Sequence, residues 1–363
     1  MSNYFVGTEV LEVDTPALMV DLDLLEKNID RASSFFRDLG VSWRPHTKGQ
    51  KVPAIAHMEI NAGAVGITCA KLGEAEVMVA AGIKSVLIAN QVVGSYKAKR
   101  LANLCRQAEV IVAVDSMENA RELDQAGRDK GLKVPVIVEI DIGMGRCGVQ
   151  PGEPTLEFSR ELHAMEGLEY LGLMGWEGHA RRFIDPDERK QVCEEAIECL
   201  VQSAQLCRQD GLPVYIVSCG GTGTHEFSSR LPGITEVQAG GIVFNDSYYS
   251  RLGLEHDFAL TVMSTVVSRP GPMRIVTDSG KKSMSSDTAL PRPQGVGEVK
   301  SLSFSAEHGV ITTEEPVTLA VGDRLEWIIG YGDTTVSLHD EMYGIRDGWV
   351  EVVWPIQGRG KIR

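Results

Sequence analysis

Residues 134–148 read VPVIVEIDIGMGRCG, an apolar run that passes directly into a glycine-rich polar turn. Valine and isoleucine fill most of the run, and this composition favours a strand that is buried on both faces. The turn places Asp141 and Arg146 where the strand stops. A buried strand that ends in a polar loop is typical of one unit of a parallel β/α fold.

The same pattern recurs along the chain on both sides of this stretch. Between the apolar runs lie longer segments, such as 24–39 and 188–210, whose apolar residues recur at helical spacing. Eight such runs, with about eight helices between them, predict an α/β fold, a closed (β/α)8 barrel. The runs that we expect to form its strands are 17–22, 41–45, 64–70, 85–90, 109–114, 134–142, 169–176 and 213–221.

The character of the sequence changes near residue 253, because the remainder contains only strand-like runs punctuated by turn residues. We expect a second, antiparallel β domain there. The N-terminal residues 1–14 are too short to fold alone and are predicted to pair with it. The expected domains are therefore the barrel at 15–252 and the β domain at 1–14 plus 253–363.

Composition limits the partners of the chain. Its 363 residues include 36 Lys and Arg against 50 Asp and Glu, a formal net charge of −14. This balance offers no electrostatic footprint for nucleic acid or an anionic membrane, so we expect a small-molecule partner. The sequence shows no signal-peptide pattern and no bilayer-length apolar stretch, and its seven cysteines lack C-x-x-C spacing. These features predict reduced thiols, no membrane insertion and a cytoplasmic location.

Candidate catalytic groups follow the apolar runs, because barrel enzymes keep their chemistry at the C-terminal ends of the strands. Lys48 ends the stretch RPHTK, and partial burial at a strand end makes a lysine amine nucleophilic toward an aldehyde; a surface lysine after a turn is the alternative. Arg146 offers a permanently charged donor, or else pairs with Asp141 or a nearby helix. His179 can move protons near neutral pH, or simply form a loop hydrogen bond.

A glycine-rich turn follows the eighth run. Residues 218–224 read SCGGTGT, and glycine amides with threonine hydroxyls suit an anion, as in the phosphate sites of the last loops of barrels. The pair Gly240-Gly241 is placed to close this cradle from the other side. A strand-end lysine, an arginine and a phosphate cradle together describe a site for pyridoxal 5'-phosphate.

At this point the chain resembles a known group, the fold-type III pyridoxal phosphate enzymes. Within them it resembles the D-threonine aldolases, 3-hydroxy-D-aspartate aldolases and D-serine dehydratases, and the resemblance implies an alanine racemase-like barrel with a second β domain. The matching stretches follow in order over nearly the whole chain: TPALMVDLDLLEKNI, WRPHTKGQK, EIDIGMGRCGV, SCGGTGT, EVQAGG, TDSGKKSMSSD and TTVSLHDEMYGIRDG.

The resemblance also implies roles for single residues. Lys48 would be the Schiff-base lysine, Arg146 the partner of the pyridine nitrogen, and His179 would line the substrate side. It further implies a homodimer with the active site at the subunit interface. The other residues expected to bind the cofactor are His46, Gly220, Gly221, Thr222, Gly223, Thr224, Gly241 and Ile242.

One departure from the group concerns a divalent metal. The group carries a metal-binding His-x-Asp or His-x-Cys where this chain has Tyr331-Gly332-Asp333. Asp333 is left as the candidate metal ligand without its usual histidine, so the metal is either weakly held or absent. Without it, Tyr331 and His179 are the candidates for acid–base work at the substrate's β-hydroxyl.

The leading interpretation is a pyridoxal phosphate-dependent lyase that acts on a D-3-hydroxy amino acid, by aldol cleavage or dehydration. An amino-acid racemase or epimerase is the first alternative, in which Lys48 and an opposing acid exchange the α-proton. A metal-independent variant of the lyase is the second. A pyridoxal phosphate carrier is disfavoured, because such relatives resemble the barrel alone.

Overall fold

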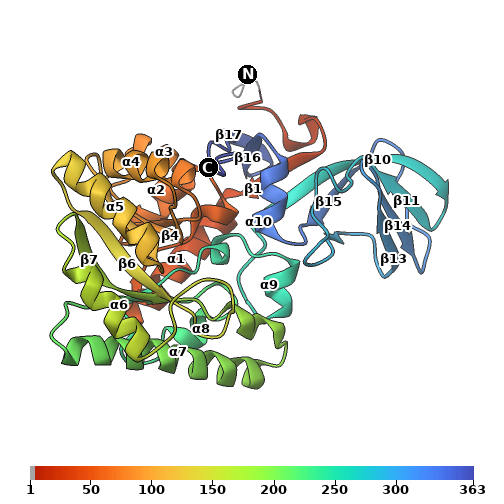
Figure 1. Cartoon of the computed structure of the whole chain (residues 1–363). Coiled ribbons are helices and arrows are strands. Elements are labelled where there is room, and N and C mark those ends of the chain that lie inside the picture. The colour runs from red at the N-terminus through yellow and green to blue at the C-terminus, as the bar shows by residue number, and fades with distance from the viewer. Residues whose placement is uncertain (1–4) are drawn as a thin grey trace. The chain divides into compact units, whose positions relative to one another are not determined.

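The computed structural model describes residues 5–363, which form two compact units (Figure 1). We call them the β unit and the barrel unit. The domain boundaries drawn from the sequence at 15 and 252 stay a prediction. The β unit contains the described residues up to Ile29 with Gly49–Val52 and Gly241–Arg359, and the barrel unit contains Asp30–Lys48, Pro53–Gly240 and Gly360–Arg363.

The barrel unit is built on an eight-stranded sheet in which every pair of neighbours is parallel. A parallel bridge between His46 and Thr68 links the two ends of this sheet. The predicted (β/α)8 class is confirmed. In the order β2-β9-β8-β7-β6-β5-β4-β3, the strands are Ser42–Trp43, Glu236–Val237, Ile216–Cys219, Leu168–Gly175, Val134–Ile140, Glu109–Val114, Ser85–Gln91 and Ile67–Cys69.

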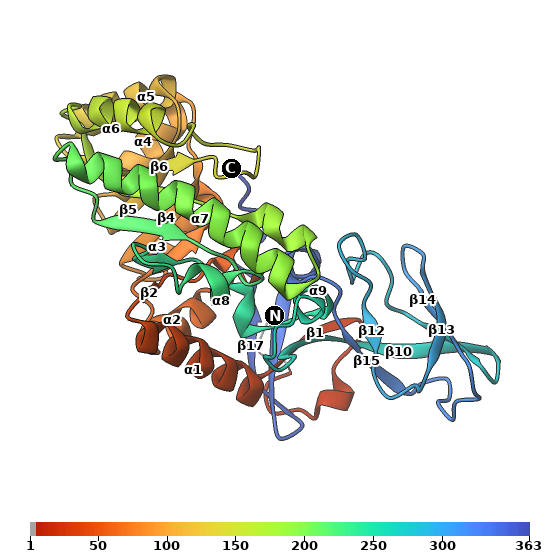
Figure 2. The ribbon, with the colours of Figure 1, turned by 90° about the horizontal axis from the view of Figure 1, so that it is seen from below.

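Helices follow the strands of the barrel unit, and the long helix α7 runs beside α6 (Figure 2). Helix α7 begins where the Asp185 carboxylate caps two backbone N–H groups and Pro186 takes the first helical position. In the part of the chain that the structure describes, no helix is long and apolar enough to cross a bilayer. The helices are α2 (Pro53–Asn61), α3 (Leu72–Ala80), α4 (Ser95–Leu104), α5 (Met117–Lys130), α6 (Glu153–His163), α7 (Pro186–Gln209) and α8 (His225–Ser228), while α1 (Leu22–Leu39) has residues in both units.

Apolar side chains from successive strands fill the core of the barrel unit. One buried cluster joins residues of β4, β5, β6 and β7, so that each strand contributes to the same core. Branched residues dominate it, as is usual for the packed interior of a barrel. The cluster comprises Leu87, Ile111, Ala113, Ile137 and Met174.

The β unit is built on a nine-stranded sheet with the order β13-β14-β11-β10-β1-β16-β17, in which β15 also pairs with β10 and β12. Among the described N-terminal residues, Glu9 forms a bridge with Trp349. Residues 1–4 of the predicted N-terminal segment lie outside the described residues, and its assignment to this domain stays a prediction. The helices α9 (Ser247–Arg251) and α10 (Gly332–Thr335) complete the unit. The strands are β1 (Ala17–Asp21), β10 (Leu260–Gly271), β11 (Arg274–Thr277), β12 (Arg292–Pro293), β13 (Val299–Phe304), β14 (Gly309–Thr313), β15 (Arg324–Ile328), β16 (Glu341–Arg346) and β17 (Trp349–Pro355).

One strand prediction for the barrel is wrong, and one barrel strand was not predicted. The run 17–22 forms β1 of the β unit, between β10 and β16, while the remaining strand of the barrel sheet is the two-residue β9. A buried run is apolar in either sheet, so its composition does not reveal its neighbours, and two residues are too few to show a period. The β domain is also not purely antiparallel, because β1 and β16 run parallel.

Candidate active site

Lys48 lies where β2 passes into a single 3-10 turn, η2 (Thr47–Gly49). Two interactions fix this turn: Thr47 Oγ1 donates to the carbonyl of Thr68 at 3.0 Å, and the Lys48 N–H donates to His46 Nδ1 at 3.3 Å. Lys48 is half-buried. The structure therefore places the lysine at a strand end, as predicted, and His46 orients its backbone.

The indole of Trp176, directly after β7 (Leu168–Gly175), gathers three cations. Lys48 Nζ lies 5.5 Å, Arg146 Cζ 5.0 Å and Arg181 Cζ 4.8 Å from the ring centroid. Cations at these distances are attracted to the electron-rich face of an indole. The sequence indicated Lys48 and Arg146 but not the tryptophan that brings them together, nor Arg181.

The loop that carries Arg146 is organised by Asp141. Its carboxylate accepts the N–H groups of Gly143 at 3.1 Å and Gly145 at 2.9 Å. Arg146 itself donates to Glu139 Oε1 at 3.4 Å rather than to Asp141. Burial raises the pKa of Glu139, while its hydrogen bond from Gln91 and the charge of Arg146 oppose that shift. Arg146 is thus held by a buried acid on the strand that precedes its loop.

His179 lies in a 3-10 turn, η3 (Gly178–Arg182), and packs against Gly143. A Cβ at Gly143 would lie 2.8 Å from His179 Cε1, and the φ of +116° at Gly143 also requires glycine. Within residues 5–363, the buried Nδ1 of His179 has no hydrogen-bond partner. Burial lowers the pKa of His179, and Arg182 lowers it further. The imidazole is therefore neutral at neutral pH and can accept a proton.

The loop Gly220–Thr224 follows β8 and is anchored by Glu177, which is fully buried. Glu177 accepts Thr224 Oγ1 at 2.6 Å and the Gly220 N–H at 3.2 Å. In the described chain, the N–H groups of Thr222 and Gly223 have no protein partner. Two backbone donors thus remain available to an anion, as a phosphate cradle needs. Sequence reasoning missed Glu177, whose role depends on contacts across the barrel.

Two other predicted cofactor residues belong to the β unit. Gly241 and Ile242 open a 3-10 turn, η4 (Gly241–Val243), in which Ile242 is fully buried. The preceding Gly240 lies in the barrel unit, where a Cβ would come within 2.1 Å of the carbonyl oxygen of His46. Gly240 thus allows close backbone approach to His46, while the roles of Gly241 and Ile242 toward a phosphate stay predictions.

Tyr331 and Asp333 lie in the β unit, at the start of α10. The phenol of Tyr331 donates to Asp333 Oδ2 at 2.8 Å, and its ring packs against those of Tyr248 and Tyr249. On the other side of the aspartate, a Cβ at Gly49 would lie 2.7 Å from Asp333 Oδ1. Gly49 follows Lys48 in the sequence.

The donor set around Asp333 does not fit a divalent metal. The described residues contain no group of three or more His, Cys, Asp or Glu side chains that could hold a metal ion. One oxygen of Asp333 is engaged by a phenol, which is a poor substitute for imidazole as a ligand. We therefore derive no step through a metal.

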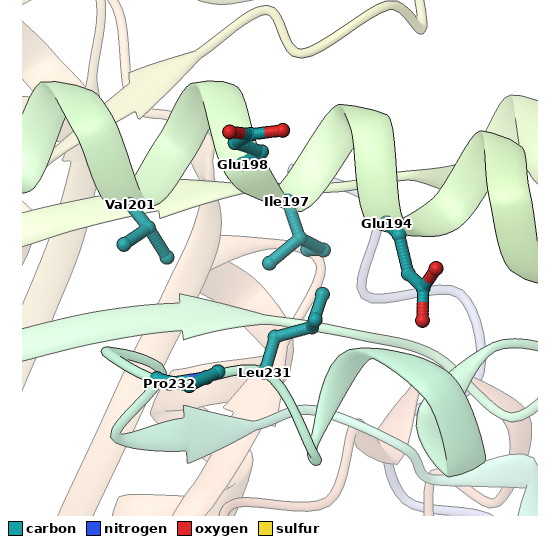
Figure 3. A pocket seen from close by; sticks show the side chains of 6 residues that line it. All are labelled: Glu194, Ile197, Glu198, Val201, Leu231 and Pro232. Carbon is teal, nitrogen blue, oxygen red and sulfur yellow. The ribbon is translucent and has the colours of Figure 1, made fainter.

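The barrel unit does fit a phosphorylated aldehyde. It offers a lysine amine at a strand end, a guanidinium near the indole of Trp176, and two backbone N–H donors in the loop after β8. A surface groove of about 360 Å³ beside α7, by contrast, is lined by Glu194, Ile197, Glu198, Val201, Leu231 and Pro232 (Figure 3). Its two carboxylates make it unsuitable for a phosphate.

Comparison with known proteins gives matches over the whole chain. Residues 20–247 match the family model for the alanine racemase N-terminal domain, and residues 259–345 match the model for a putative serine dehydratase domain. The chain is 34% identical over 359 residues to a D-threonine aldolase of Arthrobacter sp., covering 98% of this chain and 95% of the relative. It is 34% identical over 366 residues to a 3-hydroxy-D-aspartate aldolase of Paracoccus denitrificans, covering 98% and 94%.

A solved structure of a related enzyme is also similar to this chain. The D-threonine aldolase from Filomicrobium marinum superposes with a TM-score of 0.97 and 35% sequence identity, covering 100% of both chains. Fold and site together define an alanine racemase-like barrel enzyme with a second β domain. The chain belongs to this family of lyases, in the branch that includes D-threonine aldolase and 3-hydroxy-D-aspartate aldolase, which confirms the resemblance inferred from the sequence.

Proposed function

We propose that this chain is a pyridoxal phosphate-dependent lyase that breaks the Cα–Cβ bond of a D-3-hydroxy amino acid. The observation that carries the proposal is the convergence of Lys48 and Arg146 on Trp176 in a barrel whose loop after β8 keeps two N–H donors for an anion. When bound, the cofactor supplies an electron-withdrawing ring that stabilises negative charge at the α-carbon. Dehydration of the same substrates is the second candidate, favoured by the match of residues 259–345 to a serine dehydratase domain.

We assign binding of the cofactor to the barrel-unit residues and their neighbours in the chain. Lys48 would make the covalent bond to the cofactor, and Arg146 would be the partner of its pyridine nitrogen. Because a guanidinium keeps its protons, Arg146 would keep that nitrogen unprotonated. The phosphate is assigned to the loop Gly220–Thr224 with Gly241 and Ile242, and His46 orients the turn that presents Lys48.

Proton transfer at the β-hydroxyl needs a group that can accept or supply a proton. In aldol cleavage the hydroxyl loses its proton and becomes the carbonyl of an aldehyde, while the α-carbon gains a proton and leaves as glycine. His179 suits the first task because burial lowers its pKa and leaves the imidazole neutral at neutral pH. Tyr331 is kept as a second catalytic candidate on the strength of the resemblance, with its phenol oriented by Asp333.

Product analysis separates the candidate reactions. Cofactor-loaded protein is incubated with D-threonine, 3-hydroxy-D-aspartate and D-serine. Glycine plus an aldehyde supports aldol cleavage, and a 2-oxoacid plus ammonia supports dehydration. Formation of the L-enantiomer without cleavage would indicate a racemase or epimerase and contradict the proposal.

We also propose that the enzyme is a cytoplasmic homodimer whose active site is completed at the subunit interface. The cysteines of the described chain are all free thiols, which is usual in a reducing compartment. Light scattering coupled to size-exclusion chromatography tests the oligomeric state. A monomer that is fully active at assay concentration would contradict the shared site.

A further inference from the structure

The two free N–H groups in the loop after β8, those of Thr222 and Gly223, can bind an anion only if they point toward it. Their directions are set by the carbonyl at the other end of each peptide unit. A trans peptide is planar, and its C=O and N–H point in opposite directions. The carbonyls in question belong to Gly221 and Thr222, so the groups that hold these two carbonyls also aim the two N–H donors.

The carbonyl of Gly221 is held by the backbone. It accepts the N–H of Thr224 at 3.0 Å and the N–H of His225 at 2.9 Å, where the chain turns into α8. The N–H of Thr222, on the same peptide unit, therefore points away from this turn. This half of the arrangement follows from the backbone conformation of the loop.

The carbonyl of Thr222 is held by a side chain instead. His225 Nδ1 lies 2.9 Å from the carbonyl oxygen. A carbonyl oxygen only accepts hydrogen bonds, so Nδ1 must carry the proton. Burial lowers the pKa of His225, so the ring is neutral at neutral pH and its single proton lies on Nδ1. The function proposed above gives His225 no role.

Packing fixes the ring that makes this bond. His225 is 3% exposed, and its ring centroid lies 5.3 Å from that of Phe35 and 5.9 Å from that of Phe36, both on α1. A position between two phenylalanines needs only an apolar ring, and a polar ring is costly there unless it is hydrogen-bonded. The bond to the Thr222 carbonyl meets that requirement, and it is the feature that a phenylalanine at 225 would lack.

We propose that His225 is a positioning residue for the cofactor phosphate, because its bond to the Thr222 carbonyl aims the Gly223 N–H toward the phosphate. The inference rests on the proposed function, which assigns the phosphate to this loop. His225 acts through the peptide that joins Thr222 to Gly223. Its role differs from that of Glu177, which accepts hydrogen bonds from Gly220 and Thr224 at the two ends of the loop.

The test measures how much the phosphate contributes to binding. Full-length protein freed of cofactor is titrated by fluorescence with pyridoxal 5'-phosphate and with pyridoxal, which has the same aldehyde but no phosphate. His225→Phe keeps an aromatic ring and removes the donor, whereas His225→Asn keeps an N–H donor near the place of Nδ1. The matched control is His57→Phe on α2, because His57 Nε2 lies 2.9 Å from another backbone carbonyl of the barrel unit, that of Ala81.

We expect His225→Phe to weaken binding of pyridoxal 5'-phosphate about tenfold or more, since a misdirected N–H loses a hydrogen bond to a charged group. Binding of pyridoxal should stay nearly unchanged. His225→Asn should recover part of the loss, and His57→Phe should bind both ligands as the wild type does. Thermal melts check folding, and His225→Leu is the second donor-free variant if His225→Phe folds poorly.

The inference is overturned if the donor-free variant binds both ligands as the wild type does, or weakens both equally, as a general loss of structure would. It is also overturned if His225→Asn loses as much preference for the phosphorylated ligand as His225→Phe, or if the wild type shows no such preference. Failure of the proposed function gives a different pattern. In that case wild-type protein binds pyridoxal 5'-phosphate but forms no lyase products, while the two titrations still decide the role of His225.

Discussion

The phenol of Tyr331 donates a hydrogen bond to Asp333 Oδ2 at 2.8 Å. The resemblance to D-threonine aldolases places a metal-binding histidine where this chain has Tyr331. The hydrogen bond therefore joins Tyr331, which stands in place of the histidine, to Asp333, the acid of the same motif. A carboxylate that accepts a hydrogen bond from a phenol is held in one orientation without a cation. The same bond orients the phenol.

The first prediction is that wild-type protein retains no stoichiometric transition metal after dialysis. A single carboxylate with a phenol lacks the imidazole that such metals prefer, so chelator should leave activity largely intact. Tyr331→His should create affinity for manganese or zinc, with Tyr331→Phe as the matched control. Mass spectrometry of metal content checks both. A tightly held wild-type metal that Asp333→Ala releases would contradict the interpretation.

Substitution at Gly143 should disturb His179. Alanine there must adopt a φ of +116° and place its Cβ 2.8 Å from His179 Cε1, so Gly143→Ala should lower stability by about 1–3 kcal/mol and reduce kcat. Gly145→Ala is the control, since Gly145 also has positive φ but has nothing within 4 Å of the new Cβ. Thermal melts and steady-state kinetics distinguish them. Equal losses of kcat in both variants would argue against a role for His179.

Glu177 should govern cofactor affinity through the loop it anchors. Glu177→Ala leaves Thr224 Oγ1 and the Gly220 N–H without their acceptor, at a cost of about 1–3 kcal/mol for each buried donor. We expect weaker cofactor binding in a fluorescence titration and a lower melting temperature. Glu177→Gln keeps one acceptor oxygen and should lose less. Unchanged cofactor affinity in the alanine variant would show that the loop is organised without Glu177.

Glu177 should also make stability depend on pH. Burial raises its pKa, so the folded state binds a proton more tightly than the unfolded chain does. Its contribution is therefore fully present below its ordinary pKa of about 4.3 and declines as pH rises above that value. Denaturant titrations of wild type and Glu177→Gln from pH 4 upward should show the wild type losing stability relative to the variant. A constant difference between the two proteins would contradict this.

The acid limb of kcat/KM should lie below the ordinary histidine value of about 6.5, because burial and then Arg182 lower the pKa of His179. Arg182→Gln removes one of these causes and should move the limb to higher pH. Arg121→Gln, an exposed arginine on α5, is the control and should not move it. If the acid limb lies at the same pH in all three proteins, it reports the titration of a group other than His179.

The positions of Lys48, Arg146 and His179 after strands could be predicted from the sequence. A polar residue that follows an apolar run lies at the mouth of a parallel barrel, whichever strands are its neighbours. Whether these side chains come together depends instead on the register between neighbouring strands. Ile140 pairs with Gly175, so the loop of Arg146 and the indole of Trp176 emerge together. Met174 pairs with Ser218, which brings Glu177 to Gly220. One-dimensional patterns hold no register, so Trp176, Glu177 and Arg181 could not be assigned from them.

The central claim is that Lys48 carries the cofactor, and chemical trapping tests it most directly. Wild-type protein loaded with pyridoxal 5'-phosphate is reduced with borohydride, digested and mapped by mass spectrometry, with Lys51→Ala as the matched control. We predict that the label lies on Lys48 in both proteins and that Lys48→Ala takes up no label. A label on Lys51 or Lys281 in the wild type, or stoichiometric labelling of Lys48→Ala, would contradict the account.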